Sequence, residues 1–133
     1  MDKIPPSFQD LLKAEKRAFA YLATVMEDGS PQVTPVWFDM DGVHILINSE
    51  EGRIKDKNMR SRPKIALAIA DPDNPYRYIQ VRGKVVEITK VGGAEHIDRL
   101  SYKYTGNPIY EAKNPKKSRV TYKIMPEKVS VMG

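Results

Sequence analysis

Apolar and polar residues alternate along much of this chain with the two-residue period of a β-strand. The pattern predicts strands at residues 18–26, 31–40, 43–49, 64–70, 76–89, 120–124 and 128–131. Asp-Gly pairs at residues 28–29 and 41–42 are typical of the tight turns that join antiparallel strands. These turns predict that the first three strands follow one another as neighbours in one sheet.

Three other segments have helical patterns. Residues 6–17 combine a candidate cap at Ser7 with basic residues at the far end, which suits a helix dipole. A short helix is expected between Gly52, which opens it, and Pro63, which ends it. Residues 94–104 repeat apolar side chains at helical spacing, and a polar loop follows them.

The long strand at residues 76–89 contains one irregularity. Ile79 and Val81 share one face before Gly83, whereas the apolar residues after Gly83 continue on the opposite parity. A one-residue phase change at a glycine is typical of a β-bulge, which bends a strand. We therefore expect this strand to curve around a barrel.

The order of these elements predicts the fold class. Six or seven strands, two or three short helices and no regular alternation of strand and helix favour an antiparallel barrel with helices at its ends or seams. The chain has 133 residues, close to the length of about 150 residues that is typical of one domain. We expect a single domain over residues 1–133.

Composition narrows the classes of function. Hydrophobic residues make up 41% of the chain, as in ordinary globular proteins. No apolar stretch reaches the roughly 18 residues of a membrane helix, and no secretory signal is visible, so we expect a cytoplasmic protein. The chain contains no cysteine, which excludes disulfides, thiol nucleophiles and cysteine-ligated metal centres.

Side chains for hydrolytic or metal chemistry do not form a recognisable motif. The two histidines, His44 and His96, lie on different predicted elements without metal-ligand spacing, so we interpret both as structural residues and expect no metal site. The sequence has no nucleophile elbow, phosphate-binding loop or dinucleotide fingerprint. Any chemistry would therefore be supplied by a bound cofactor, and no catalytic side chain is assigned.

The net charge of +5 has one concentrated source. Residues 52–64 carry six cations against a single acidic residue, and they follow a strand that ends at Asn48 and Ser49. A helix N-terminus, a hydroxyl, an amide and the cations Arg53 and Lys55 would then face one spot. Such a spot binds phosphate. The alternative is a basic helix face that only meets solvent.

Two further stretches are candidates to border a ligand. Pro35 removes a hydrogen-bond donor from the strand at residues 31–40, which indicates an edge, a bulge or a ligand-facing break. Trp37, the single tryptophan, is either a core residue or a cofactor contact. Tyr76 and Tyr78 are interface anchors, ring-stacking groups or ordinary strand residues.

The ordered set of segments resembles a known family. AYLATVMEDGSPQVTPVWFDMDG, INSEEGRIKDKNMRSRPKIAL and DPDNPYRYIQVRGKVVEI are similar to the pyridoxamine 5′-phosphate oxidase-like flavin-binding split barrels, and in particular to the branch that uses the deazaflavin coenzyme F420. The similarity covers about residues 15–90, and RVTYKIMPEKVSV resembles the family's last strands. It implies a mainly β fold with short helices: a homodimer of six-stranded antiparallel Greek-key split barrels, with two cofactor sites at the dimer interface.

The resemblance assigns the phosphate end of that cofactor site. Arg53 and Lys55 would hold the cofactor phosphate, assisted by Ser49 and Asn48, while Asn58 would support the loop or reach the ligand. The deazaflavin also has an anionic lactyl-glutamate tail. The remaining cations of the basic run would favour this tail: Lys57, Arg60, Arg62 and Lys64.

The ring end of the site is assigned by the resemblance alone. The stretch Thr34, Pro35 and Val36 would lie along the tricyclic ring and present backbone polar groups to it, and Ile47 would pack nearby. The two tyrosines at residues 76–78 would come from the second subunit and border the ring. The protein would thus orient the ring, tune it electrostatically and exclude water from it.

By resemblance, the function is that of an F420-dependent oxidoreductase that passes hydride from the reduced deazaflavin to a small unsaturated or quinone-like substrate. Flavin mononucleotide (FMN) shares the phosphate anchor, so an FMN-binding flavoprotein is one alternative, and a non-catalytic carrier of either cofactor is another. A barrel that binds single-stranded nucleic acid would need exposed aromatics between cations, and the tyrosines beside Arg77 match this only faintly. We expect neither a nucleic acid nor a membrane as a partner.

Overall fold

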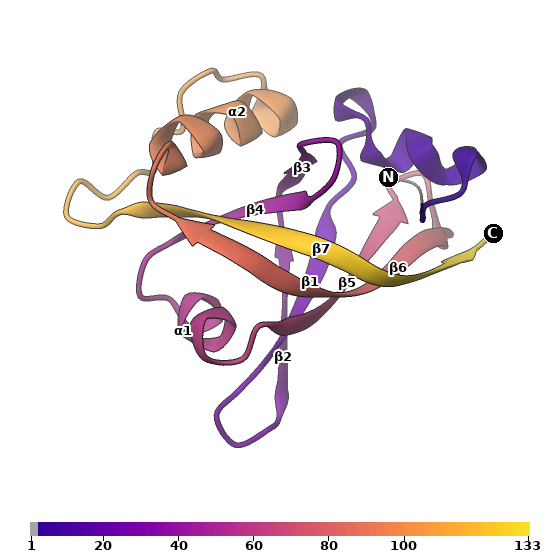
Figure 1. Cartoon of the computed structure of the whole chain (residues 1–133). Coiled ribbons are helices and arrows are strands. Elements are labelled where there is room, and N and C mark those ends of the chain that lie inside the picture. The colour runs from indigo at the N-terminus through magenta and orange to yellow at the C-terminus, as the bar shows by residue number, and fades with distance from the viewer. Residues whose placement is uncertain (1–2) are drawn as a thin grey trace.

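Strands, two α-helices and two short 3₁₀ helices make up the computed structural model, which describes residues 3–133 (Figure 1). The strands are β1 (Ala20–Val25), β2 (Pro31–Val36), β3 (Phe38–Met40), β4 (Ile45–Glu50), β5 (Lys64–Asp71), β6 (Asn74–Thr89) and β7 (Arg119–Met132). The 3₁₀ helices are η1 (Pro6–Leu12) and η2 (Ala14–Lys16), and the α-helices are α1 (Ile54–Ser61) and α2 (Gly93–Thr105). The helices predicted at residues 52–63 and 94–104 are confirmed.

The strands form one antiparallel sheet in the order β2-β1-β5-β6-β7-β4-β3. β2 and β3 stand at opposite ends of this order, although only Trp37 separates them in the sequence. The sheet must therefore curl until its two ends approach each other, which gives the half-barrel of Figure 1. The predicted mainly β class with short helices is confirmed.

The sheet over residues 3–133 has seven strands, where the sequence pattern predicted six or seven and the family resemblance implied six. Trp37 divides the strand expected at residues 31–40, because β2 pairs with β1 whereas β3 pairs with β4. Pro126, by contrast, does not end a strand. It lies opposite Gly83 beside a register shift, where the irregular pairing tolerates a residue without an N–H. The two strands expected at the C-terminal end therefore join as β7.

β6 contains a bulge, but not at the predicted residue: the extra residue in β6 is Val86, whereas the extra residue opposite Gly83 is Glu127 of β7. The register between β6 and β7 shifts between Arg82 and Gly83, and again between Val85 and Glu87. The backbones come so close at Gly83 that an added Cβ would lie 2.5 Å from the carbonyl oxygen of Met125. Only glycine permits this approach, so Gly83 allows β6 to bend while it pairs with β5 on one side and β7 on the other.

The α-helix predicted at residues 6–17 is wrong in type, because the segment forms η1 and η2 with an extended residue between them. Phe8 and Leu11 are buried three positions apart, a spacing that matches the three residues per turn of a 3₁₀ helix. The expected serine cap makes no capping hydrogen bond. Instead, Arg77 of β6 donates to the Asp10 carboxylate at 2.6 Å. Contacts with the sheet therefore decide the local conformation.

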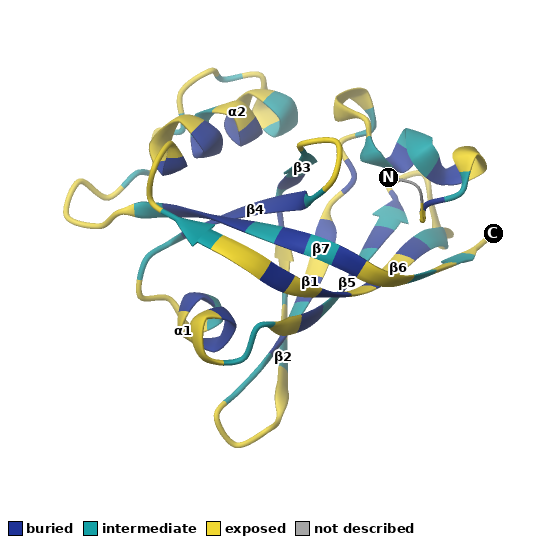
Figure 2. Ribbon diagram, in the orientation of Figure 1, coloured by how far each residue is buried: buried dark blue, intermediate teal, exposed yellow. Residues whose placement is uncertain are grey.

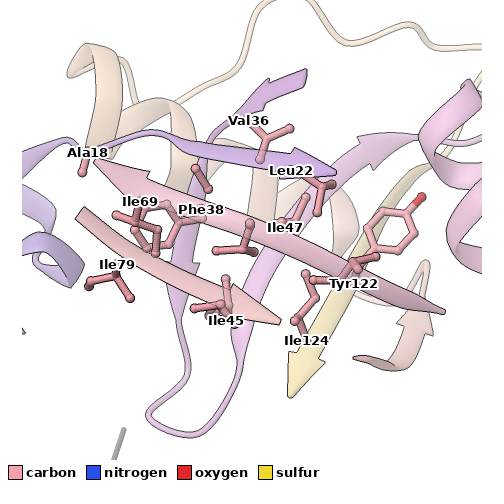
Figure 3. Close-up of a cluster of buried hydrophobic side chains, with 14 of the residues drawn as sticks. Ala18, Leu22, Val36, Phe38, Ile45, Ile47, Ile69, Ile79, Tyr122 and Ile124 are labelled. Atoms are coloured by element: carbon pink, nitrogen blue, oxygen red, sulfur yellow. The ribbon is translucent and has the colours of Figure 1, made fainter. Parts of the chain in front are cut away.

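The hydrophobic core fills the inside of the curl. Every strand contributes buried apolar side chains, and η1 and α1 add theirs from the rims. Figure 2 shows buried positions along β4 and β7 and on the side of α2 that faces them, and Figure 3 shows Phe38, Ile47 and Ile69 directed into the same cluster. No helix within residues 3–133 is long and apolar enough to cross a membrane.

We predict that Gly83→Ala destabilises the fold by about 1–3 kcal/mol, the usual cost of forcing an atom into a filled space. The added methyl group would collide with the Met125 carbonyl, which belongs to backbone and cannot move aside as a flexible side chain would. Urea denaturation monitored by circular dichroism measures the change. Arg82→Ala, an exposed neighbour on the same strand, is the control and should shift stability by less than about 0.5 kcal/mol. Equal effects of the two substitutions would contradict the prediction.

Candidate functional site

A cavity of about 300 Å³ opens where the two ends of the sheet meet. β2, β4, the start of α1, α2 and the loop after α2 all contribute to its walls. The lining residues are Phe19, Pro35, Val36, Trp37, Asn48, Ser49, Glu50, Arg53, Lys55, Ile97, Leu100, Tyr110 and Arg119. Apolar and aromatic side chains form one part of this wall, and polar and charged side chains form the other.

The split in the sheet explains why a cavity forms here. β3 pairs with β4 only as far as Ile47, so Asn48, Ser49 and Glu50 extend beyond it. β2 is the last strand at its end of the sheet and pairs with β1 alone among the strands of residues 3–133. Two strand edges with unpaired backbone groups therefore flank the cavity. Such edges can form hydrogen bonds with a ligand.

Three cations gather at the polar end of the cavity. Arg53 lies at the exposed rim, while Lys55 and Arg119 are half-buried. None of the three forms an ion pair with a carboxylate in the part of the chain that the structure describes. Burial lowers the pKa of Lys55, and repulsion from Arg53 and Arg119 lowers it further. A group of like charges, two of them half-buried and none in an ion pair, is typical of an anion-binding site.

Arg119 lines the cavity, although it is not among the residues predicted for the cofactor site. Burial, with repulsion from Arg53, lowers its pKa, while nearby Tyr110 and Glu50 act in the opposite direction. Its Nε donates to Oδ1 of Asn48 at 2.8 Å, and its guanidinium lies 5.4 Å from the centre of the Tyr110 ring. Arg119 reaches the site because β7 pairs with β4, a contact 71 residues apart in the sequence that no local pattern indicates.

A buried carboxylate holds the loop that carries Arg53 and Lys55. Asp56, on the first turn of α1, accepts hydrogen bonds from the Gly52 N–H at 2.9 Å and from Nε of Arg60 at 3.0 Å. The hydroxyl of Tyr122 donates a third, short hydrogen bond to it. Burial raises the pKa of Asp56, but these donors outweigh it and leave the pKa below the ordinary 3.8. The single acidic residue of the basic run therefore fixes the loop in place.

Part of the basic run faces away from the cavity. Arg60 pairs with Asp56 and Glu51. Arg62 donates from Nε to the Val25 carbonyl at 2.7 Å. Neither of these arginines lines the cavity, and neither do Lys57 or Lys64. The cations that remain for an anion at this site come from two segments, the start of α1 and the start of β7.

An aromatic stack forms the opposite wall. The ring of Tyr104 lies between Phe19, at 5.3 Å between centroids, and Trp37, at 5.2 Å, with both pairs nearly parallel. Tyr110 meets Trp37 edge-on at 5.9 Å. The Tyr104 hydroxyl donates to the Ala18 carbonyl at 2.6 Å, and burial raises its pKa. Trp37 is thus held by α2 as part of the cavity wall.

Most of the residues predicted for the cofactor site lie together at this cavity. Its walls include Pro35, Val36, Asn48, Ser49, Arg53 and Lys55. Thr34 does not line it but lies next to Pro35. Its Oγ1 is the one side-chain polar atom within residues 3–133 that is buried without a hydrogen-bond partner. A polar atom of a ligand at this edge of β2 would give that hydroxyl a partner.

Four predicted site residues lie elsewhere in this chain. Ile47 is fully buried in the core. Asn58 is buried on α1, where it donates to Oγ1 of Thr24 at 3.0 Å, so it supports the helix instead of lining the cavity. Tyr76 and Tyr78 lie at the start of β6 outside the cavity, and Tyr76 is 82% exposed. Their assignment to a site in a second copy stays a prediction.

Comparison with known proteins gives a consistent picture. The family model described as pyridoxamine 5′-phosphate oxidase matches residues 4–133. The chain belongs to this family. A solved structure named F420 reductase is 35% identical, has a TM-score of 0.84, and the alignment covers 96% of this chain and 98% of that one. The resemblance to the family and to its F420 branch is confirmed.

More distantly similar solved structures share the fold. A structure described as a putative pyridoxamine 5′-phosphate oxidase from Listeria innocua is 19% identical, with a TM-score of 0.70 and 94% of each chain covered. The heme storage protein HutZ from Vibrio cholerae is 14% identical, with a TM-score of 0.68, and the alignment covers 98% of this chain and 96% of that one. No curated protein matches this chain.

We predict that Tyr122→Phe lowers the free energy of unfolding at pH 7 by about 1–3 kcal/mol, because the buried Asp56 carboxylate loses a hydrogen-bond donor. The folded pKa of Asp56 is depressed, so the stabilisation is present above its unfolded value near 3.8 and is lost as pH falls through the folded value. The difference between the two proteins should therefore narrow in acid. Urea denaturation at pH 7 and pH 3 measures it, and a difference that is the same at both would contradict the assignment.

Proposed function

We propose that this protein is an F420-dependent oxidoreductase that holds the deazaflavin in the cavity and reduces a small unsaturated or quinone-like substrate. The observation that carries the proposal is the group Arg53, Lys55 and Arg119, three cations without a carboxylate partner beside an apolar and aromatic wall. A ligand that suits both ends has an anionic tether and a flat ring. Flavins and deazaflavins have this shape.

The polar end suits a phosphate group. Lys55 and Arg119 supply half-buried charge, and Arg53 supplies exposed charge at the rim. The buried Ser49 adds a hydroxyl to the same wall. A bound dianion would relieve the repulsion that lowers the pKa of Lys55, so the binding free energy includes both attraction and the relief of this repulsion.

The other end suits a ring system. Val36, Ile97 and Leu100 are buried apolar residues, and Trp37 and Phe19 add aromatic surface. The free edge of β2 presents backbone polar groups, and the unpartnered Thr34 hydroxyl lies beside it. Apolar walls with a few polar atoms at one edge are typical of pockets that hold a cofactor ring. The residues present therefore fit the cofactor.

When bound, the deazaflavin ring supplies the hydride chemistry. The side chains of the cavity have other tasks. The cations anchor the tether, the strand edge orients the ring, and the aromatic wall excludes water from one side of the cavity. No acid or base from this chain is assigned a proton-transfer role.

The choice of F420 is supported by the name of the 35% identical structure. FMN is the alternative cofactor, because it has the same kind of phosphate tether and ring. The cavity does not separate an enzyme from a carrier of the cofactor, so turnover with quinones or other unsaturated acceptors is the measurement that distinguishes them. The structure named for heme storage is only 14% identical and supports the fold alone.

A second copy of the chain is the proposed partner. The outer face of β2, β1 and β5 carries apolar side chains, including Tyr21, 44% exposed, and Val33, 64% exposed. Ala66 and Ala68 continue this face on β5. Phe19 and Pro35 belong both to this region and to the cavity wall. A copy docked here would cover the open side of the cavity, and Tyr78, which lies opposite Ala70, faces the same way.

We predict that Lys55→Ala weakens binding of F420 or FMN by about 2 kcal/mol, roughly thirtyfold in Kd, through loss of charge-assisted hydrogen bonds to the phosphate. Fluorescence titration of the purified protein measures the affinity. Riboflavin, which has the ring of FMN without the phosphate, should bind the variant and the unaltered protein equally.

Lys57→Ala is the matched control for this titration, because it removes the same charge from the same helix at an exposed position outside the cavity. It should change the affinity less than twofold, the scale of a screened surface charge. Equal effects of Lys55→Ala and Lys57→Ala would show that only the overall positive charge attracts the ligand, and the phosphate assignment would then be wrong.

We predict that Ala68→Glu weakens a homodimer by about 3 kcal/mol or more, because it places an unpaired charge on the proposed interface. Sedimentation equilibrium measures the dissociation constant. Val43→Glu, in the exposed turn before β4, is the control and should leave the association unchanged. A protein that is monomeric at micromolar concentration without any substitution would contradict the proposed partner.

A further inference from the structure

A buried network of side chains stands behind the anion-binding end of the cavity. Asn48 of β4 donates from Nδ2 to the Gly93 carbonyl at 2.9 Å and contacts Nδ1 of His96 at 3.2 Å. Its Oδ1 accepts the hydrogen bond from Nε of Arg119. On the far side, Nε2 of His96 lies 2.8 Å from Oδ1 of Asp39. The network thus runs from β3 through α2 and β4 to the cation in the cavity wall.

Only one orientation of the Asn48 amide satisfies its neighbours. The Gly93 carbonyl can only accept a hydrogen bond, and Nε of Arg119 can only donate one. The NH₂ group therefore faces Gly93 and His96, and the oxygen faces Arg119. Nδ2 has only hydrogens to offer, so an accepting Nδ1 of His96 satisfies this contact and can also accept from the Thr121 hydroxyl, and it leaves the ring proton on Nε2 to be donated to Asp39.

The network has little room to rearrange. His96 is 2% exposed, and Oγ1 of Thr121 holds the same Nδ1 atom at 3.0 Å. At Gly93, an added Cβ would lie 2.1 Å from the carbonyl oxygen of Arg119, so α2 begins directly against the start of β7. A change in the Asn48 amide would therefore pass to the Arg119 side chain.

Arg119 keeps donors for a ligand. Its Nε is used by Asn48, whereas its Nη groups have no hydrogen-bond partner within residues 3–133. The Tyr110 ring lies against the guanidinium and limits its swing. A guanidinium held at one nitrogen and on one face presents its remaining N–H groups in a fixed direction, which suits an oxyanion.

We propose that His96 is a positioning residue of the anion site: it fixes the amide of Asn48, and Asn48 aims Arg119 at the anionic group of the ligand. This inference rests on the proposed function. It gives a role in ligand binding to a histidine that does not touch the cavity. A histidine that only fills the core would stabilise the fold without affecting where Arg119 points.

Two substitutions of His96 distinguish positioning of Asn48 from filling of the core, because each preserves the hydrogen bond at only one of the two ring nitrogens. His96→Asn places an amide oxygen near the position of Nδ1, so the acceptor for Asn48 is kept and the contact with Asp39 is lost. His96→Gln places its terminal amide near the position of Nε2, so the contact with Asp39 is kept and the acceptor for Asn48 is lost. Both replace a buried ring by a smaller amide, so their effects on stability should be similar.

The first readout needs no ligand. In nuclear magnetic resonance spectra, the Nε–H of Arg119 should exchange slowly with water in the unaltered protein and in His96→Asn, and at least about tenfold faster in His96→Gln, the scale of one lost hydrogen bond. The His96 ring of the unaltered protein should show its proton on Nε2. A proton on Nδ1 at neutral pH, or an unchanged Arg119 signal in His96→Gln, would overturn the proposal even if a variant folds poorly.

The second readout uses FMN and riboflavin as probes of the phosphate. His96→Gln and Arg119→Ala should each lower the ratio of FMN to riboflavin affinity by about tenfold, while His96→Asn should leave the ratio within about threefold. Combining His96→Gln with Arg119→Ala should give no further loss, because both act on one contact. An equal loss of riboflavin and FMN binding would indicate a general packing defect and would overturn the proposal. Absence of FMN and F420 binding by the unaltered protein would instead refute the proposed function, while the Arg119 signal would still decide whether His96 positions this side chain.

Discussion

The site exists because a single residue, Trp37, joins the two opposite ends of the sheet. Its neighbours on either side belong to β2 and β3, which lie at the two ends of the strand order. The sheet is therefore forced to curl, but its ends do not pair, and β4 runs past β3 without a partner on that side. An antiparallel sheet with unpaired edges must cover them or offer them to another molecule. Here α2 and its following loop cover part of the opening, and the rest is the cavity.

The positive charges at the opening of the cavity destabilise the folded protein when no anion is bound. Lys55 and Arg119 lose hydration and repel Arg53, and no carboxylate pairs with any of the three within residues 3–133. Arg77, by contrast, is matched by carboxylates and bonds to both Asp10 and Asp71. Arg77 thus has two carboxylate partners, whereas the three cations at the cavity have no ion-pair partner. A bound anion would remove the repulsion among these three cations.

A feature can be predicted from the sequence when the residues that determine it are close together along the chain. Most strands and both α-helices follow from neighbouring residues and are confirmed, whereas the strand at residues 31–40 is divided and the bulge of β6 lies at Val86 instead of Gly83. The 3₁₀ helices η1 and η2 contact the sheet through Arg77, which bonds to Asp10 from 67 residues away, and a local helix pattern does not indicate this contact. The basic run and the strand end at Ser49 predict a candidate anion site from one segment, whereas Arg119 reaches the same cavity through the pairing of β4 with β7. Trp37 allowed two interpretations, and only the stack on Tyr104 places it in the wall.

The same reasoning shows why net charge is a poor guide to function in this chain. The basic run looks uniform in sequence, yet Arg60 and Arg62 are used within the fold, bonding to Asp56 and to the Val25 carbonyl. Lys55 comes from the same run, has no such partner and lines the cavity. What distinguishes a candidate ligand-binding cation is therefore the absence of an internal carboxylate partner combined with partial burial, because an exposed cation is satisfied by water and a paired one by its carboxylate. By this criterion Arg119, which lies outside the basic run at residues 52–64, belongs with Lys55, whereas Arg60, only five residues away from Lys55, does not.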